Sequence, residues 1–162
     1  MAKALVTYYS RTGNTKKMAE AIAESLRTNG VQTDLRKVES LAVPELLGYE
    51  AVIIGSPTYY GTMSWEVKKL LDESVKFHGK LGGRVGGAFT SSGNIAGGNE
   101  TTVLDILKAL MIHGMVVQGD PQGDHYGPAA VGRPDQRSLK SCQRYGQRLA
   151  GLTKKLFPDP KA

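Results

Sequence analysis

Three segments rich in Ser, Thr and Gly follow apolar runs, and they hold the residue types most able to bind a small molecule. The first is residues 10–15, Ser-Arg-Thr-Gly-Asn-Thr. Its small side chains let backbone N–H groups turn toward one point, and the start of a following helix favours negative charge. The loop therefore predicts a phosphate site, with an ordinary helix cap at Thr12 or Asn14 as the alternative. A nucleotide P-loop is excluded because no Gly-Lys-Ser/Thr follows.

The other two segments could hold a flat ring. Residues 55–64, Gly-Ser-Pro-Thr-Tyr-Tyr-Gly-Thr-Met-Ser, place two adjacent tyrosines in a Pro/Gly loop. Such tyrosines are poorly placed for a core, and a heteroaromatic ligand would give them a stacking partner; a surface turn is the alternative. Residues 90–100, Thr-Ser-Ser-Gly-Asn-Ile-Ala-Gly-Gly-Asn-Glu, expose backbone amides that could bond the rim of a ring. They could equally be only the start of a helix.

A single histidine near the end of a predicted helix has two interpretations. His113 stands just before Gly114, a position typical of a C-terminal helix cap. It could also reach over a bound ring as a hydrogen-bond donor. No metal site is predicted, because the one cysteine, Cys142, has no set of zinc-ligand partners.

Apolar runs and helical spacing alternate along the chain, which indicates where these segments lie. Strands are predicted over residues 3–9, 31–37, 51–55, 85–89 and 115–118. Helices are predicted through 18–26, from Trp65, over 101–113 and over 136–156; in the third of these, Leu104, Leu107, Leu110 and Met111 should face inward. The alternation predicts an α/β three-layer sandwich: a five-stranded parallel sheet of order 2-1-3-4-5 with helices on both faces. Ligands then bind at the carboxyl ends of the strands.

Composition sets the remaining limits. The chain has 162 residues, which suits a single domain over 1–162, and a net charge of +6. No apolar run is long enough to span a bilayer, and no signal-peptide pattern opens the chain, so a cytoplasmic protein is expected. The charge resides in the last helix and tail, where a basic stripe of Arg137, Lys140, Arg144, Arg148 and Lys155 follows one helical arc. We expect a solvated face with weak, sequence-independent DNA binding and no specific nucleic-acid partner.

Taken together, these motifs resemble the flavodoxin-like proteins, and in particular the WrbA-type NAD(P)H:quinone oxidoreductases. The resemblance covers nearly the whole chain. It is carried by Ser10-Arg-Thr-Gly-Asn-Thr15, Ser56-Pro-Thr-Tyr-Tyr-Gly61, Thr90-Ser-Ser-Gly93, Gly97-Gly-Asn-Glu-Thr101, His113-Gly-Met115 and Gly132-Arg-Pro-Asp135. The chain departs from the family in having only residues 38–49 between the second and third strands, and in lacking a clear counterpart of a substrate-side Trp.

The resemblance implies FMN as cofactor, with NAD(P)H as co-substrate and a quinone as electron acceptor at the same face. Tyr60 and His113 would be the catalytic residues over the ring. The cofactor-binding set would be Ser10, Arg11, Thr12, Gly13, Asn14, Thr15, Pro57, Thr58, Tyr59, Tyr60, Gly61, Ser91, Ser92, Gly93, Asn94, Ile95, Gly97 and His113. A homo-oligomer, dimer or tetramer, is also implied. The alternative is a flavodoxin-type electron carrier without substrate turnover; such carriers are usually acidic around the flavin, whereas this chain is basic.

Overall fold

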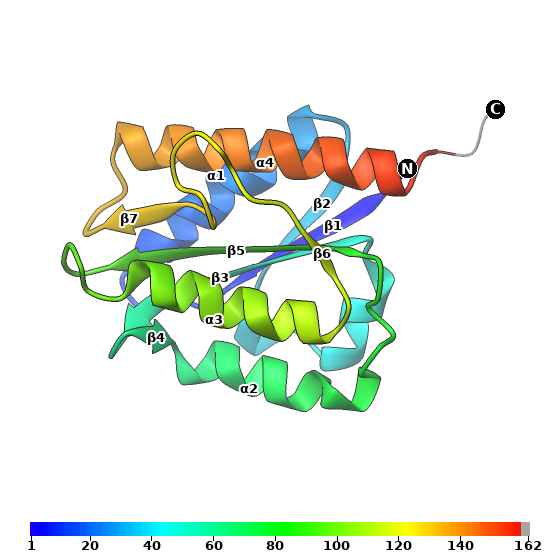
Figure 1. Cartoon of the computed structure of the whole chain (residues 1–162), viewed down its shortest axis with the longest axis horizontal. Helices are drawn as coiled ribbons and strands as arrows, with labels where there is room; N and C mark the ends of the chain where they lie inside the picture. The colour runs from blue at the N-terminus through cyan, green and yellow to red at the C-terminus, as the bar shows by residue number, and fades with distance from the viewer. Residues whose placement is uncertain (160–162) are drawn as a thin grey trace.

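A parallel sheet forms the middle layer of the computed structural model, which describes residues 1–159 (Figure 1). Its main path runs β2-β1-β3-β5-β6, and β4 and β7 attach to β3 and β5. The strands are β1 (Lys3–Tyr8), β2 (Gln32–Lys37), β3 (Ala51–Tyr59), β4 (Thr62–Met63), β5 (Val85–Ser92), β6 (Val116–Val117) and β7 (Ala129–Val131). All pairings are parallel except that of β3 with β4. This arrangement confirms the predicted order 2-1-3-4-5.

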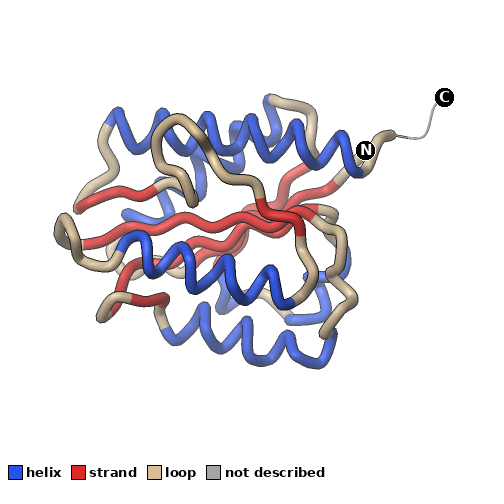
Figure 2. Tube along the Cα trace, viewed as in Figure 1, coloured by secondary structure: helices blue, strands red, loops and turns tan. Residues whose placement is uncertain are grey.

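Helices cover both faces of the sheet (Figure 2). They are α1 (Asn14–Thr28), α2 (Trp65–Glu73), α3 (Asn99–Ile112) and α4 (Gln136–Leu156), with short 3-10 helices at Val38–Ser40, Val43–Gly48 and Ser74–Phe77. Because strand side chains alternate, Ala4 and Val6 pack in the core beneath α1 and α4, whereas Leu5 packs in the core beneath α2 and α3. The predicted last helix has the observed bounds. Met111 was predicted to face inward and is instead 48% exposed, because Val103 and Ile106 occupy the buried face of α3.

One strand was predicted beside β5 at the edge of the sheet, and the structure has two short strands there instead, β6 and β7. β6 pairs with the start of β5 and β7 with its end, and residues 118–128 loop out between them. The backbone N–H of Ala88, in the gap, donates instead to the Tyr145 hydroxyl of α4 at 3.0 Å. Burial raises the pKa of Tyr145 to about 12, so the hydroxyl stays neutral. Tyr145 thus takes the place of the missing ladder bond.

A tight hairpin extends β3 beyond the sheet. Thr58 and Tyr59 pair with Met63 and Thr62 of β4, which leaves Tyr60 and Gly61 as the turn. Both turn residues have positive φ, 49° and 80°, the pattern of a type I′ turn. The segment predicted as an irregular loop is therefore a hairpin with a tyrosine at its tip.

Within residues 1–159, none of the helices combines the length and apolar character required for crossing a membrane.

Candidate functional site

The loop between β1 and α1 begins the site, and it leaves two backbone N–H groups without an acceptor among residues 1–159. The Ser10 hydroxyl accepts from the N–H groups of Gly13 (3.1 Å) and Lys16 (3.2 Å), and these two bonds fix the conformation of the loop. Gly13 is the N-cap of α1 at φ 91° and offers no capping side chain. Neither Thr12 nor Asn14 caps the helix, and the N–H groups of Asn14 and Thr15 find no acceptor among residues 1–159. The loop is thus open at a helix N-terminus, as an anion site requires.

Three loops meet at the carboxyl edge of the sheet around one cavity of about 330 Å³. The cavity is lined by Arg11, Thr12, Asn14, Thr15, Pro57, Thr58, Tyr59, Ser91, Ser92, Gly93 and Gly132. Ten of these eleven belong to the predicted cofactor-binding set. Gly132, after β7, was not in that set, although it opens the Gly-Arg-Pro-Asp motif quoted from the sequence.

Hydroxyl groups tie the three loops together beneath the cavity. Thr15 Oγ1 and Ser91 Oγ lie 2.9 Å apart and join the first loop to β5. Thr58 Oγ1 lies 2.9 Å from both Thr90 Oγ1 and Thr102 Oγ1, linking β3 to β5 and to α3. Every member of this network is partly or fully buried, so its bonds fix the relative positions of the loops that line the cavity.

Backbone contact fixes the hairpin tip against the loop of residues 93–98. A Cβ on Gly98 would lie 2.4 Å from Gly61 Cα, so only glycine permits this approach, and Gly98 also has φ 103°. Thr101 Oγ1 donates to the Gly61 carbonyl at 2.5 Å. The predicted site residues Asn94 and Gly97 lie in this exposed loop.

Two large apolar side chains are left in solvent at this edge. Tyr60 is fully exposed at the hairpin tip, with a relative accessibility of 108%, and Ile95 is 86% exposed. A bulky side chain at positive φ is unfavourable, and a side chain in solvent adds nothing to the core. The stability of the fold therefore does not explain a tyrosine at position 60. Tyr59 packs edge-on against Tyr9, with ring centroids 6.5 Å apart. Of the two adjacent tyrosines, Tyr59 is therefore supported by the fold and Tyr60 is free to contact a ligand.

His113 does not join these residues within one chain. α3 starts at the carboxyl edge and runs back across the sheet, so its 14 residues carry His113 about 21 Å away. The side chain is 6% exposed, and its Nε2 lies 2.7 Å from Ser74 Oγ. Because the Ser74 hydroxyl donates to the Leu71 carbonyl, it accepts from His113. Burial, and secondarily His78, lowers the pKa of His113. The residue is a buried C-cap, so we assign it no part in the site formed by its own chain.

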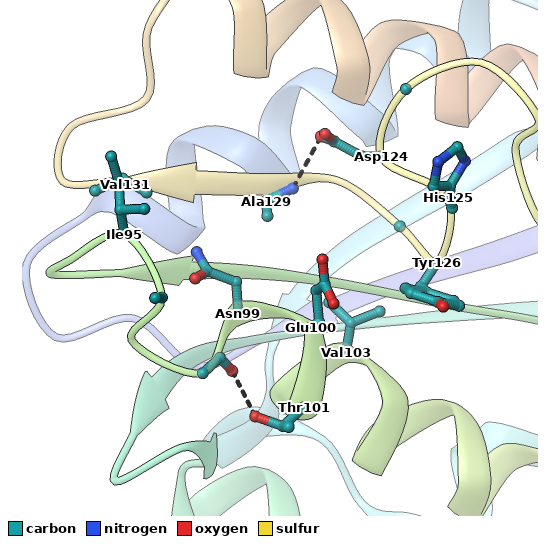
Figure 3. Close-up of a pocket in the computed structure, with 14 residues that line it drawn as sticks. Ile95, Asn99, Glu100, Thr101, Val103, Asp124, His125, Tyr126, Ala129 and Val131 are labelled. Atoms are coloured by element: carbon teal, nitrogen blue, oxygen red, sulfur yellow. Dashed lines mark hydrogen bonds between the residues drawn. The ribbon is translucent and has the colours of Figure 1, made fainter.

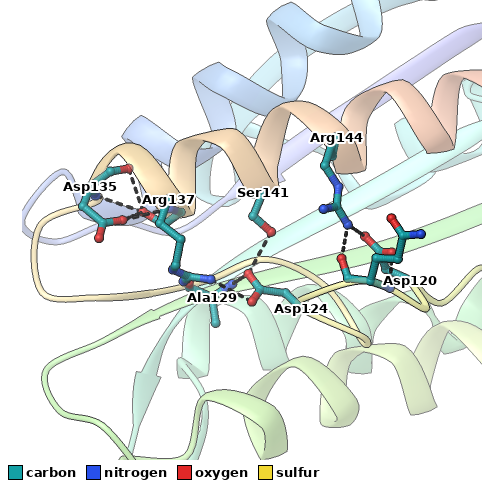
Figure 4. A network of polar contacts seen from close by, with 9 residues as sticks. Asp120, Asp124, Ala129, Asp135, Arg137, Ser141 and Arg144 are labelled. Carbon is teal, nitrogen blue, oxygen red and sulfur yellow. Dashed lines mark hydrogen bonds and ion pairs between the residues drawn. The ribbon is translucent and has the colours of Figure 1, made fainter.

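The basic stripe of α4 makes ion pairs that were not predicted from the sequence. Arg144 pairs with Asp120, and Arg137 pairs with Asp124 at 2.9 Å (Figure 4). Arg148 also pairs with Asp120, at 2.6 Å. Burial alone would raise the pKa of Asp120, but hydrogen bonds from the Gln122 N–H and the two arginines outweigh it and hold the pKa at about 2. Three of the five stripe residues therefore clamp the loop 118–128. Arg137 and Arg144 nevertheless stay 60% and 45% exposed, like the exposed Lys140 and Lys155, so only Arg148, at 18%, departs from the predicted solvated face.

Within residues 1–159, no group of three His, Cys, Asp or Glu side chains has the arrangement of a metal site. The polar groups that line the cavity include backbone amides, hydroxyls, the Asn14 carboxamide and the Arg11 guanidinium. These donors suit an organic anion rather than a cation.

Comparisons with known proteins agree with this geometry. A family model described as a flavodoxin domain matches residues 5–115. A flavodoxin of Aquifex aeolicus is 39% identical, covering 93% of this chain and 86% of that protein. An NAD(P)H dehydrogenase (quinone) of Archaeoglobus fulgidus is 34% identical, covering 96% and 100%. The solved WrbA-like flavodoxin from Agrobacterium tumefaciens superposes with a TM-score of 0.83 at 29% identity, covering 96% of this chain and 99% of that one.

The residues present fit the cofactor that a flavodoxin domain implies, FMN. At the start of α1 the N–H groups of Asn14 and Thr15 are free to bind a phosphate, and a Cβ added at Gly13 would meet nothing within 4 Å, so the loop is open rather than filled by the chain itself. Pro57, Thr58 and Tyr59 on one side and Ser91, Ser92 and Gly93 on the other would flank the rest of the molecule. By its sequence and its fold, this chain belongs to the flavodoxin family.

Proposed function

We propose that this protein is an FMN-dependent oxidoreductase that takes two electrons from NAD(P)H and passes them to a quinone. The observation that carries the proposal is Tyr60, an aromatic side chain held fully in solvent at a strained hairpin tip beside the cavity. A face bordered by a free aromatic ring admits flat substrates, and a stacked ring contributes about 0.5–1.5 kcal/mol beyond burial.

The charges around the cavity favour a nucleotide substrate over an acidic docking surface. Arg11 lines the cavity, and Lys16 and Lys17 are exposed on the first turn of α1, which contains no acidic residue. Arg11 and the lysines of α1 would attract the pyrophosphate of NAD(P)H on that side of the cavity and raise the rate of encounter. An electron carrier that docks on basic partners would need the opposite sign.

Each part of the chain has a defined task in this proposal. Bound FMN supplies the redox chemistry, accepting two electrons and returning them. The amides of residues 10–15 hold the phosphate, the hydroxyl network fixes the loops, and Tyr60 orients one flat substrate after the other. No side chain of the site needs to act as nucleophile, which suits a site of hydroxyls and amides.

The electron-carrier function is the second candidate, and it is favoured by the similarity to the Aquifex aeolicus flavodoxin. The two candidates differ in whether the reduced nicotinamide reacts directly.

Anaerobic mixing of the FMN-loaded protein with NADH or NADPH separates the two functions. The enzyme should lose its visible flavin absorbance in one phase and regain it when a soluble benzoquinone is added. Steady-state turnover should exceed about 1 s⁻¹, the lower end of ordinary enzymes. If neither nucleotide bleaches the flavin while dithionite does, the enzyme proposal is wrong and the carrier function stands.

A further inference from the structure

A second and larger cavity, of about 570 Å³, lies beside the first at the sheet edge (Figure 3). It is bounded by the loop 95–98 and the start of α3 on one side and by residues 123–131 on the other. The loop 93–98 stands between the two cavities: Gly93 lines the first, whereas Ile95 and Ala96 line the second. Likewise Val131 faces the second and Gly132 the first. The two cavities are therefore neighbours with a shared wall.

The walls of this second cavity are apolar and incompletely covered. Tyr126 and Val131 remain 46% and 45% exposed, and Ile95 is almost wholly in solvent. Val103 of α3, which is buried, also lines the cavity. Exposed apolar side chains around a concavity of this volume are typical of a small-molecule site.

Three polar side chains that line it, those of Asn99, His125 and Glu100, offer hydrogen-bond acceptors. Asn99 donates its Nδ2 to Ser92 Oγ at 2.7 Å, which leaves its Oδ1 as an acceptor. His125 Nδ1 lies 2.7 Å from the Asp120 carbonyl, which can only accept, so the neutral ring presents Nε2 as a lone pair. The exposed Glu100 carboxylate makes no ion pair within residues 1–159.

Two further polar groups of the wall, the Asp124 carboxylate and the Ala129 backbone, are already occupied. Asp124 accepts from Arg137, from the Ser141 hydroxyl and from the backbone N–H of Ala129. The Ala129 carbonyl accepts from Arg137 at 2.6 Å. Both backbone groups of Ala129 on this edge strand are thus bonded to side chains, so an added peptide strand could not pair with Ala129. Recognition here must come from the free side chains.

We propose that this second cavity binds a flat aromatic molecule that presents hydrogen-bond donors, such as a hydroquinone, an aminophenol or a protonated aromatic amidine. Tyr126, Ile95 and Val131 would enclose the ring, and Glu100 would accept from its donors. A carboxylate gives a charge-assisted bond, roughly twice as strong as a neutral one. An anion of the same shape would be repelled. This binding does not depend on the proposed quinone reduction, because the residues that would bind the ligand are not those that we propose to hold the phosphate of FMN or to orient the quinone.

Matched probes test this donor requirement on the FMN-loaded, ¹⁵N-labelled protein. Benzamidine and benzoate have one shape but opposite charge and bonding polarity; 1,4-dihydroxybenzene and 1,4-dimethoxybenzene form a similar uncharged pair. Benzamidine and the diol should shift the amide signals of Glu100, Tyr126 and Val131 saturably. Their partners should bind at least about tenfold more weakly, because each replaces donors by acceptors.

Variants assign the interaction to its residues. Glu100→Gln should weaken benzamidine binding about tenfold and Tyr126→Ala should weaken it further, whereas Glu73→Gln, an exposed carboxylate on α2, should leave it unchanged. Equal binding of benzoate, no effect of Glu100→Gln, absence of saturation, or shifts confined to residues 10–15 would each overturn the proposal. None of these outcomes bears on NAD(P)H oxidation, which is measured separately.

Discussion

The loop of residues 10–15 and the loop of residues 118–128 are both polar, yet they satisfy their polar groups in different ways. In the first, Ser10 organises the chain, but the N–H groups of Asn14 and Thr15 have no acceptor among residues 1–159. In the second, Asp120 pairs with two arginines of α4, and Asp124 pairs with Arg137 and also accepts from the Ser141 hydroxyl and the Ala129 N–H. Buried or constrained polar groups are costly when unpaired, so open donors indicate a ligand and paired ones indicate a structural clamp.

The largest effect should come from separating the hairpin tip from the loop 93–98. Gly98→Ala adds a Cβ that would lie 2.4 Å from Gly61 Cα at φ 103°, so the two loops must move apart. We expect loss of FMN binding and a fall of about 2–4 kcal/mol in the free energy of unfolding. Gly83→Ala is the matched control, because Gly83 has a similar φ of 78° but open space. If both variants retain FMN equally in equilibrium dialysis, the close approach is not what holds the site.

The open loop predicts a large preference for a phosphate-bearing flavin. Two free amides, each able to make a charge-assisted hydrogen bond of about 1.5–3 kcal/mol, predict that FMN binds at least on the order of 100-fold more tightly than riboflavin. Ser10→Ala frees the Gly13 and Lys16 N–H groups and loosens the loop, so FMN should bind about tenfold more weakly and riboflavin unchanged. Fluorescence titration with both flavins measures this, and an equal loss for the two would contradict a phosphate role.

Breaking the clamp should destabilise the second loop without touching the first. Asp120→Asn removes the charge that Arg144 and Arg148 share, and we expect a loss of about 1–2 kcal/mol with FMN affinity unchanged. The pKa of Asp120 is lowered to about 2, so its contribution is present above pH 3.8 and is lost as pH falls toward 2. The stability difference between wild type and variant should therefore shrink below about pH 4 in urea titrations. A constant difference down to pH 2 would show that the charge is not responsible.

His113→Ala tests whether His113, at the buried end of α3, has a structural role rather than a catalytic one. The change removes the bond to Ser74 and leaves a small cavity, so the free energy of unfolding should fall by about 1–2 kcal/mol. Quinone turnover by the FMN-loaded protein should be unaffected, because His113 lies at the other edge of the sheet. Ser74→Ala should reproduce the loss of stability. A turnover defect with normal stability would restore the catalytic role predicted from the sequence.

The parts of the fold that depend on local pattern were predictable. Apolar runs located the five strand positions, and the polar stretches after them located the phosphate loop, because both signals lie within a few consecutive residues. The split of the fifth strand was not predictable, since it depends on Asp120 pairing with Arg144, 24 residues later. The hairpin was missed because Tyr is not a residue that favours positive φ. The position of His113 could have been found by following α3, which must run antiparallel to the strands.

The smallest effect, and the sharpest test of the open edge, is expected from Tyr60→Asn. Tyr60 occupies a turn position at φ 49° where Asn is preferred before Gly, and its side chain contributes nothing to the core because it is fully exposed. Asn should therefore raise the free energy of unfolding by about 0.5–1 kcal/mol. Replacement of the neighbouring Tyr59, which packs against Tyr9, should lower it.

If Tyr60 orients the substrates as we propose, the same Tyr60→Asn variant should lose about tenfold in kcat/KM for the quinone, because one stacking contact is removed. Chemical denaturation and steady-state kinetics on the same preparation measure both quantities. A variant that is more stable and equally active would mean that the exposed ring has no part in catalysis; one that is less stable would mean that the hairpin geometry depends on the tyrosine itself.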